Sequence, residues 1–417
     1  MSSSIYAGAA TITITPSTDP GPVYLAGFDA NRRATGVHDE LYSRAFALRV
    51  LADDVSTGSG ETLVLVVCDL IGLLRAEVQT IEQAARAGAK ERGMELGTLV
   101  IACTHTHSGP DTLGLWGPSR FRSGANPHYR AWLRAQIADA AVQAVAALRP
   151  ARLCAGRGEM SAWLKNTRQP KIVDRELSAL QATTLDGDAI FTLVNLACHP
   201  EVMWNDNTLV SADYAGAACR TIEAKAGGIA VLASADLGGM MTPDVPEHTF
   251  EIAENMGRAV AHAALDTINA GERLRPQALI IRQREVHIPL ENPLFKLALT
   301  TRVLPALGRD AKGRVVTRVS LLDLGKLRLV TIPGELLPGP GIALREMLGV
   351  PYRFLIGLAD DELGYLLSSD EFTFPRNPFR PGDHYEETMS LSRSATPLLM
   401  EAWAALLPSA TQRGSTL

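Results

Sequence analysis

Short apolar runs that end in polar turns recur along this chain, and they predict the strands of a buried sheet. Residues 63–68, 99–103, 190–197 and 229–233 are runs of this kind, with few polar positions inside them. Continuous apolar strands are typical of sheets that are covered on both faces. Between the first two runs, residues 76–91 carry apolar side chains at helical spacing, which predicts a strand–helix–strand unit with parallel strands.

Alternating or helical periodicity predicts further elements around these runs. Strands are expected at residues 7–15, 46–51, 151–156, 277–290, 315–322, 327–332 and 351–357. Helices are expected at residues 129–148, 247–269 and 394–407. The chain contains no internal repeat, low-complexity linker or break in composition. We therefore predict a single α/β domain over residues 1–417, built from mixed, largely buried β-sheets flanked by helices.

The composition is that of a globular protein, and it narrows the classes of partner. The chain has 417 residues, of which 46% are hydrophobic and 20% charged, and its formal net charge is -5 at pH 7. This charge argues against nucleic acid or an anionic membrane surface as a partner. Because no apolar run is long enough to cross a bilayer, we expect no stable membrane association. The oligomeric state stays open.

The cysteines and the first residues indicate the compartment. The chain has five cysteines, which lie mostly in apolar strand or helix patterns: Cys68, Cys103, Cys154, Cys198 and Cys219. An odd number in such positions predicts buried thiols rather than a disulfide framework. The first residues lack the basic and apolar segments of a secretory signal. We therefore expect a cytoplasmic protein.

Two histidines stand one residue apart at the end of the run 99–103. In an extended segment, residues i and i+2 point to the same side, so His105 and His107 face one way. The carboxyl ends of strands are where α/β sheets usually hold ligands, and neutral imidazole is the commonest metal ligand. Since two imidazoles do not complete a tetrahedral zinc site, a pair of ordinary hydrogen-bonded histidines stays an alternative.

A second apolar strand ends in the same way. The run 190–197 leads into His199, and Pro200 then forces a turn. Two separate strands that deliver histidine at the same topological point favour the metal site over the alternative. Glu335 follows the predicted strand 327–332 after a Pro-Gly turn and is a third candidate ligand, although it could instead cap a helix.

Three further polar residues are candidates for supporting roles. Asp69 ends the run 63–68, where a buried carboxylate could orient a metal-binding histidine. Arg168, in a polar turn, could hold an oxyanion or a substrate carboxylate, although an exposed loop arginine is the ordinary alternative. Thr242 places a hydroxyl in a loop whose glycines let the backbone approach a ligand closely.

A long loop beside the histidines predicts a lid or pocket wall. Residues 113–128 are rich in glycine, proline and aromatic residues and have neither helical nor strand periodicity. Side chains that suggest an apolar wall, or alternatively packed core, are Trp116, Phe121, Trp204, Met240 and Met241.

Two other patterns of metal-dependent hydrolases fit poorly. A metallo-β-lactamase-type site needs His-x-His-x-Asp-His, but Gly109 and Pro110 occupy the last two positions of that motif. An amidohydrolase barrel needs two further histidines and an aspartate at later strand ends, and only His199 lies at such a point.

Five separated stretches resemble the N-terminal catalytic domain of the neutral/alkaline (non-lysosomal) ceramidases. They run in family order along nearly the whole chain, at residues 26–28 with 36–38 and 41–45, 102–110, 197–200, 333–335, and 364–365 with 385–387. The most specific stretch is Thr104-His105-Thr106-His107-Ser108-Gly109-Pro110. The resemblance implies the fold of that domain, and we expect the immunoglobulin-like C-terminal domain of the longer members to be absent.

The resemblance also implies one zinc ion per chain, bound by two histidines, a glutamate and a tyrosine. These ligands correspond to His105, His199, Glu335 and Tyr365 of this sequence. His107 corresponds to the catalytic histidine of the family.

Two further correspondences concern the reacting groups. Arg168 matches a family arginine that follows an asparagine. Residues 238–243 replace the family's Gly-Asp-Val-Ser-Pro loop, so Thr242 stands where a serine is expected.

The resulting prediction is a zinc-dependent hydrolase that cleaves the C–N bond of a small or N-acyl amide with metal-activated water. The expected partner is this small-molecule substrate. His107 would carry a proton to the leaving nitrogen, and Arg168 or Tyr365 would face the developing oxyanion. Two alternatives stay open, namely an esterase or lactonase that uses the same site, and a catalytically inactive binding protein of the same fold.

Overall fold

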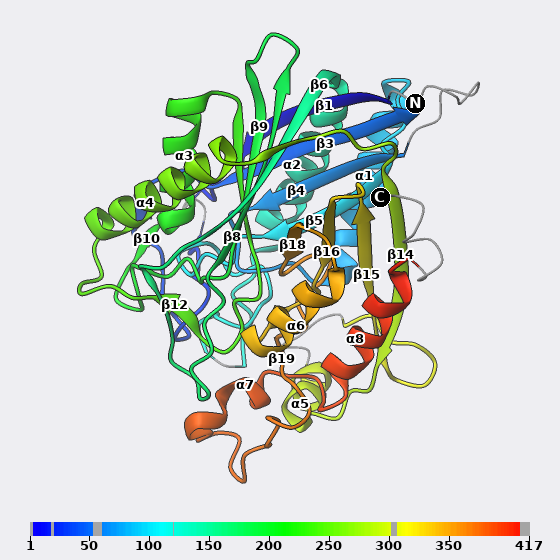
Figure 1. Ribbon diagram of the computed structural model, residues 1–417. Coiled ribbons are helices and arrows are strands. Elements are labelled where there is room, and N and C mark those ends of the chain that lie inside the picture. Colours follow the sequence, from blue (N-terminus) through cyan, green and yellow to red (C-terminus); the bar gives the residue numbers. More distant parts are fainter. Residues whose placement is uncertain (1–2, 18–20, 53–60, 120, 302–306, 409–417) are drawn as a thin grey trace.

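A nine-stranded mixed sheet forms the centre of the molecule (Figure 1). The computed structural model describes residues 3–17, 21–52, 61–119, 121–301 and 307–408. Eight strands of the sheet form one path, in the order β11 (Ile229–Ser234), β9 (Ala189–Leu196), β8 (Glu176–Thr184), β6 (Arg149–Glu159), β1 (Ser3–Thr13), β3 (Tyr42–Ala52), β4 (Thr62–Cys68) and β5 (Thr98–Cys103). The ninth strand, β13 (Glu272–Leu274), pairs with β6.

The strand pairs at the two ends of this path are parallel, and they are the strands that the continuous apolar runs predict. β4 pairs with β5, and β9 pairs with β11. Every residue of β4 is buried, as expected for a strand with both faces covered. Helix α1 (Arg75–Glu91) connects β4 to β5, which confirms the predicted strand–helix–strand unit.

A second, four-stranded sheet packs face to face against the first. Its order is β14 (Ile280–Ile288), β15 (Val315–Asp323), β16 (Leu327–Thr331) and β18 (Tyr352–Ile356). β15 and β16, both expected as strands, pair as an antiparallel hairpin, and β16 pairs with β18 in parallel. One apolar layer joins the two sheets, and it includes Phe46 and Phe191 from the first and Leu329 and Phe354 from the second.

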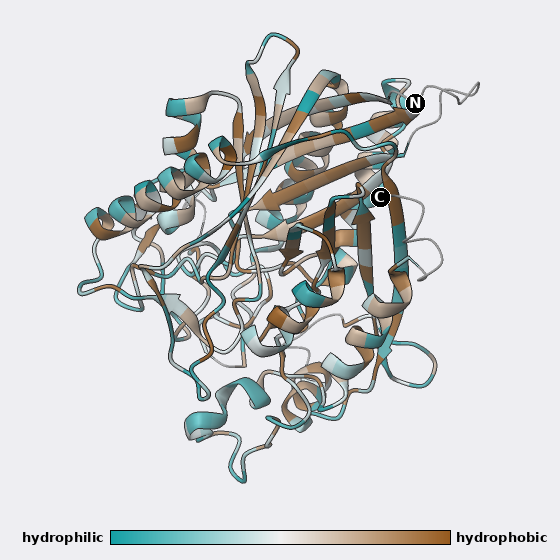
Figure 2. Cartoon of the chain, in the orientation of Figure 1, coloured by the Kyte–Doolittle hydropathy of each residue, from teal (hydrophilic) through white to brown (hydrophobic). Residues whose placement is uncertain are grey.

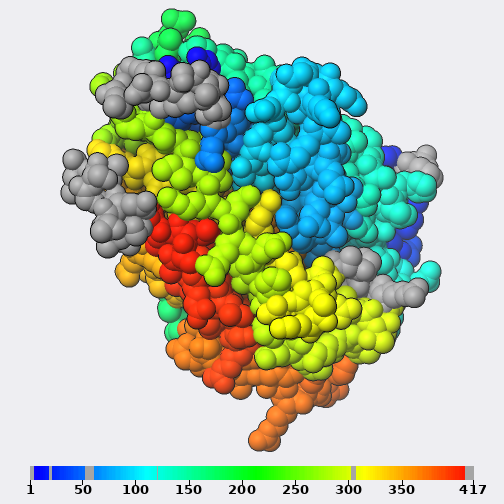
Figure 3. Space-filling view, turned by 90° about the vertical axis from the view of Figure 1, so that its right-hand side faces the viewer, coloured from blue at the N-terminus to red at the C-terminus, as the bar shows by residue number. Residues whose placement is uncertain are grey.

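Helices cover the outer face of each sheet. Those on the large sheet are α1, α2 (Pro127–Ala146), α3 (Asp213–Ala226) and α4 (Phe250–Asn269). Those on the small sheet are α6 (Pro338–Leu348) and α8 (Ala395–Leu406), and Figure 3 shows α8 in red beside the yellow-green β14. In Figure 2 the strands of the large sheet are mostly brown, while teal positions gather on helices such as α4. This layering confirms the predicted fold class.

Short strand pairs shape the loops at the ends of the sheets. They are β2 (Gly36–Val37) with β10 (Leu209–Val210), β7 (Leu164–Asn166) with β12 (Met241–Pro243), and β17 (Glu335–Leu336) with β19 (Tyr365–Leu366). The remaining elements are α5 (Pro293–Thr300), the 3₁₀ turn η1 (Gly382–His384) and α7 (Tyr385–Thr388). These connections bring loops from distant parts of the sequence to one place.

Some elements escaped prediction because tertiary pairing determines them. β8 mixes Glu, Ser, Gln and Thr with Leu and Ala, so neither strand nor helix periodicity dominates its sequence. It becomes a strand through antiparallel pairing with β6 on one side and β9 on the other. The single domain over residues 1–417 stays a prediction. Among the helices of the described residues, none combines the length and apolar character that a membrane span requires.

Candidate functional site

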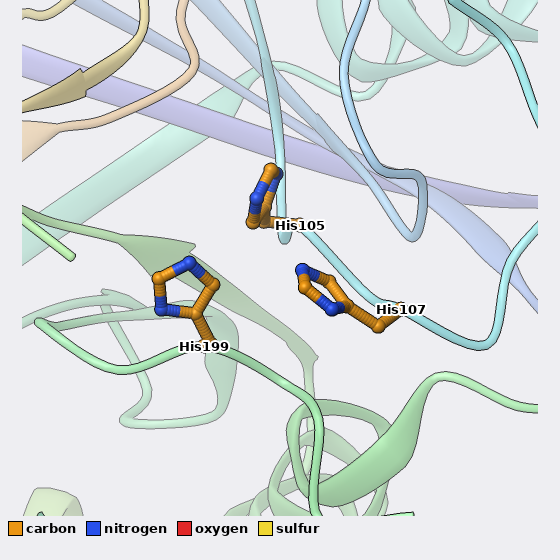
Figure 4. Close-up of side chains that lie close together, drawn as sticks. All are labelled: His105, His107 and His199. Carbon is orange, nitrogen blue, oxygen red and sulfur yellow. The ribbon is translucent and has the colours of Figure 1, made fainter. Parts of the chain in front are cut away.

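Three histidines meet where β5 and β9 end. His105 and His107 follow β5, and His199 follows β9. One ring nitrogen of each histidine lies within 4.8 Å of the others, and the three rings gather around one point in Figure 4. The main-chain amide of His107 donates to the carbonyl of Pro200 (3.1 Å), which ties the two segments together. All three side chains are buried, so the group could hold a metal ion.

The backbone turns sharply at His105. Its φ of 69° lies in the left-handed region, which is unfavourable for a residue with a β-carbon. The His105 amide donates to the carbonyl of Leu70 (2.9 Å). The preceding carbonyl, of Thr104, accepts from the hydroxyl of Ser234 (2.7 Å). The surrounding hydrogen bonds therefore hold the strained turn that aims this imidazole.

Main-chain carbonyls fix the orientation of two of the imidazoles. The Nδ1 of His105 lies 2.5 Å from the carbonyl of Ile71, and the Nδ1 of His199 lies 2.7 Å from that of Met241. A carbonyl only accepts, so each Nδ1 carries the proton and each Nε2 is left for another partner. Both Nε2 atoms approach the Oε2 of Glu335, at 3.1 Å from His199 and 3.6 Å from His105.

The protonation of these two histidines differs because their surroundings differ. Burial lowers the pKa of His105 to about 3, so its imidazole is neutral at pH 7. Burial also opposes protonation of His199, but the carboxylates of Glu201 and Glu335 outweigh it and raise the pKa to about 9. In the metal-free protein, a proton on the Nε2 of His199 therefore satisfies Glu335. A cation placed there would displace that proton.

His107 faces a different carboxylate, that of Glu201. Its Nδ1 lies 3.1 Å from the Oε2 of Glu201, and the Glu201 side chain is completely buried. Burial alone would raise the pKa of Glu201, but the neighbouring histidines His107 and His199 hold it at about 2. The hydroxyl of Thr242 also lowers this pKa. Sequence reasoning gave Glu201 no role, although its place two residues after His199 was a usable signal.

Several buried polar atoms of this cluster lack hydrogen bonds, as expected where a cation and a substrate would bind. Within the described part of the chain, both ring nitrogens of His107 and both carboxylate oxygens of Glu201 are buried without an aligned hydrogen bond. Buried polar atoms are nearly always satisfied, so such a concentration needs an explanation. Imidazole nitrogens of His105 and His199 beside the Glu335 carboxylate are a donor set that suits zinc. The residues therefore fit the predicted metal.

An apolar cavity of about 140 Å³ opens beside the histidines. His105, His107 and Glu335 belong to its wall. The predicted wall loop 113–128 contributes three residues, including Trp116. The apolar lining consists of Ile71, Leu74, Leu113, Leu115, Trp116, Leu294, Phe295, Ala298, Leu307 and Met389. The cavity can therefore accept an apolar chain next to the buried polar cluster.

Tyr365, predicted as the fourth ligand, lines the same cavity. It lies beside Glu335 because β17 and β19 pair in parallel with these two residues in register. Its hydroxyl contacts the sulfur of Met240 at 3.6 Å. The structure thus places His105, His107, Glu335 and Tyr365 on the wall of one cavity, and the Nε2 of His199 lies 3.1 Å from Glu335.

Arg168 occupies a separate position. Its guanidinium contacts Glu386 at 2.7 Å and Glu387 at 3.1 Å. Both acids belong to α7, and Tyr385 and Thr388 of the same short helix line the cavity. The ion pairs of Arg168 thus anchor a piece of the cavity wall.

Asp69 and two predicted wall residues do not have the expected contacts. Asp69 accepts from the main-chain amide of Tyr42 (2.9 Å), and main-chain carbonyls orient His105 and His199 instead, so the role expected for Asp69 is wrong. Phe121 is 73% exposed. Trp204 packs against Phe28, with ring centroids 5.1 Å apart.

Histidines and an acid at the strand ends of a helix-covered mixed sheet, next to an apolar cavity, define a class of α/β protein with a candidate metal centre. A family comparison gives the same result from the sequence side. The model of the family described as neutral/alkaline non-lysosomal ceramidase, N-terminal, matches residues 8–245, which is more than half of the chain. The chain belongs to this family.

Individual relatives match over a similar region. The neutral ceramidase of Pseudomonas aeruginosa is 27% identical over 240 residues, which is 52% of this chain and 34% of the relative. The neutral ceramidase of Mycobacterium tuberculosis is 31% identical over 225 residues, which is 49% of this chain and 33% of the relative. The matched part of the chain thus spans about a third of the length of these relatives.

Solved structures extend the likeness of fold to nearly the whole chain. The crystal structure of neutral ceramidase from Pseudomonas aeruginosa has a TM-score of 0.77 and 19% identity, covering 97% of this chain and 74% of that one. A ceramidase complexed with C2 has a TM-score of 0.78 and 18% identity, covering 98% of this chain and 76% of that one. At this identity the likeness concerns the fold alone.

The proposed ligand set predicts that metal content depends on His105 and His199. We expect His105→Ala and His199→Ala to lower bound zinc from about one ion per chain to a small fraction, because each removes a nitrogen donor. Elemental analysis of purified, zinc-equilibrated protein measures this. His262→Ala, on the exposed side of α4, is the matched control and should keep its zinc. Unchanged zinc in both cluster variants would contradict the assignment.

Proposed function

We propose that this protein is a zinc-dependent amide hydrolase that acts on a small or N-acyl substrate. The observation that carries the proposal is the approach of the two Nε2 atoms, of His105 and His199, to the buried Glu335 carboxylate at the end of an apolar cavity. The family and the relatives named neutral ceramidase support an amide as the bond that is cleaved. The substrate itself is part of our proposal.

His105, His199, Glu335 and Tyr365 would hold one zinc ion per chain. When bound, zinc lowers the pKa of a coordinated water to about 7 and polarises a carbonyl group. The main-chain carbonyls behind the two imidazoles hold a proton on each Nδ1, which would leave both Nε2 atoms available to the ion, as is usual for metal-binding histidines. Tyr365 borders the cavity and is our candidate for facing the oxyanion.

His107 would deliver the proton to the leaving nitrogen. Glu201 is the positioning residue for this step, because its carboxylate lies at the Nδ1 of His107 and leaves the Nε2 for the substrate. Burial lowers the pKa of His107, and the charged acid at Nδ1 counteracts this by stabilising the imidazolium form, from which the proton would be given. Thr242 would support Glu201 through its hydroxyl, which is the role we assign to this residue.

Arg168 acts on the substrate side of the site through α7. A guanidinium shared by Glu386 and Glu387 has little charge left for an oxyanion, so we place its contribution in shaping the cavity. The lining next to α7 is apolar, which favours an acyl chain over a charged substrate. The same centre could hydrolyse an ester or a lactone. Rates on matched amides, esters and lactones distinguish these activities.

Removal of the metal tests the reaction class. We expect a zinc chelator to abolish hydrolysis of an N-acyl amide, and added zinc to restore it, because the residues alone supply no strong electrophile. Initial rates on a panel of amides, matched esters and lactones measure this. Hydrolysis that survives complete chelation would contradict the proposal, and ester turnover without amide turnover would favour the esterase.

Replacement of His107 should lower turnover without changing the zinc content of the protein. We expect His107→Ala to lower kcat by about 10²–10⁴-fold, the usual contribution of a proton-transferring side chain, while zinc content stays unchanged. Glu201→Gln is expected to lower kcat less, because it weakens only the contact that positions the imidazole of His107. Steady-state kinetics with parallel elemental analysis measures both variants. Loss of zinc in His107→Ala would instead make His107 a ligand.

A further inference from the structure

Residues 24–33, the hairpin loop, lie against the segment that carries His107. An antiparallel bridge closes the loop at its two ends. The main-chain amide of Ala26 donates to the carbonyl of Gly109 (3.0 Å), two residues beyond His107. The loop therefore has a fixed place beside the residue that we propose as the proton donor, although the proposed reaction gives the loop itself no role.

Two residues of the hairpin loop enclose the imidazole of His107. Gly27 has a φ of 102°, and a β-carbon added there would lie 2.6 Å from the Nδ1 of His107. The backbone at Gly27 is thus in close contact with the ring and leaves no space for a side chain. The ring of Phe28 meets the imidazole edge to face, with centroids 4.8 Å apart. The orientation of the imidazole therefore depends on the position of this loop.

Arg32 connects the hairpin loop to His107 through its buried guanidinium group. One terminal nitrogen donates to the main-chain carbonyls of both Ala26 and His107. The other terminal nitrogen donates to the carbonyl of Trp204 (3.2 Å), in a third segment of the chain. The central carbon of the guanidinium also lies 5.1 Å from the centroid of the Phe28 ring. One side chain thus joins the loop, the His107 segment and the Trp204 segment.

The charge of Arg32 has an unusual environment. Within the described residues, its guanidinium is hydrogen-bonded to carbonyl oxygens rather than to a carboxylate. Burial lowers its pKa to about 10, although the nearby charge of Asp29 opposes this shift, so the group stays protonated at pH 7. A buried charge without a paired carboxylate is costly. A rigid fork of donors can join several carbonyls in one geometry, which accounts for an arginine at this position.

We infer that Arg32 is a positioning residue for His107, which holds the imidazole in the orientation that proton delivery to the leaving nitrogen requires. Arg32 is not among the described residues that line the apolar cavity, so its effect would pass through His107 rather than through the substrate. The inference rests on the proposed function for the role of His107.

Arg32→Met tests the inference, because it keeps an unbranched stem and removes every donor. We expect kcat for an N-hexanoyl alkylamide to fall by about 10–100-fold while zinc content and KM stay unchanged, since a displaced proton donor slows only the chemical step. Arg32→Lys keeps the charge on a single nitrogen and should recover part of the loss. Arg33→Met, at the exposed neighbouring position, is the matched control and should keep the wild-type kcat.

Two further readouts distinguish the positioning of His107 from a general loss of structure. In a His107→Ala background, Arg32→Met should lower kcat by no more than about twofold, because the group that Arg32 positions is already absent. With a p-nitroanilide, whose amine leaves with less need for a proton, the loss in Arg32→Met should be smaller than with the alkylamide. An equal loss on both substrates, or the same fold-loss with and without His107, would overturn the inference.

The outcomes separate this inference from the proposed function. If the wild type cleaves amides and the losses from Arg32→Met and His107→Ala are independent, the inference is wrong and the amidase proposal stands. If the wild type cleaves no amide, crystal structures of the wild type and Arg32→Met decide, because the inference requires the His107 ring to leave its contacts with Gly27 and Phe28 in the variant. An imidazole that stays in its wild-type position would contradict it. Circular dichroism checks folding, and Arg32→Gln, which cannot reach all three carbonyls, serves if Arg32→Met does not fold.

Discussion

A buried carboxylate between two imidazoles is the constraint on which the site depends. Glu335 lies 3.1 Å from the Nε2 of His199 and 3.6 Å from that of His105, and all three side chains are shielded from water. Burial of a charged acid is costly unless it is paired. In the metal-free protein a proton on His199 supplies the pairing, and in the proposed enzyme zinc supplies it. The same three side chains therefore connect the stability of this region with its chemistry.

The architecture explains how residues so distant in sequence reach one point. His105 and His199 come from β5 and β9, which belong to opposite ends of the large sheet path, and the loop amide of His107 joins the two segments through Pro200. Glu335 arrives from the small sheet, because the chain leaves β16 through a Pro-Gly turn and forms β17. Face-to-face packing of the two sheets thus brings the acid to the histidines.

Much of this arrangement could be predicted from the sequence, because strand ends are visible in it. The apolar runs indicate both strands and place His105 and His199 just beyond their ends. They do not indicate the left-handed turn that aims His105, because the expected direction assumed an extended backbone there. β8 was missed because its residues have no clear period, and only its neighbours make it a strand. Glu201 was also missed, because its place two residues after His199 was a signal that it lies near the site but did not show which side chain it would face. The role expected for Asp69 failed for the related reason that main-chain carbonyls do not appear in a sequence pattern.

The most direct test of the central claim is to locate the metal. Crystals of the zinc-equilibrated protein, measured on both sides of the zinc absorption edge, give an anomalous difference map that identifies the ion and its position. The account predicts one strong peak per chain, with zinc–nitrogen distances of about 2.0–2.1 Å to the Nε2 atoms of His105 and His199 and the Glu335 carboxylate also bound. A map without a peak between these side chains, with His199 still hydrogen-bonded to Glu335, would contradict it.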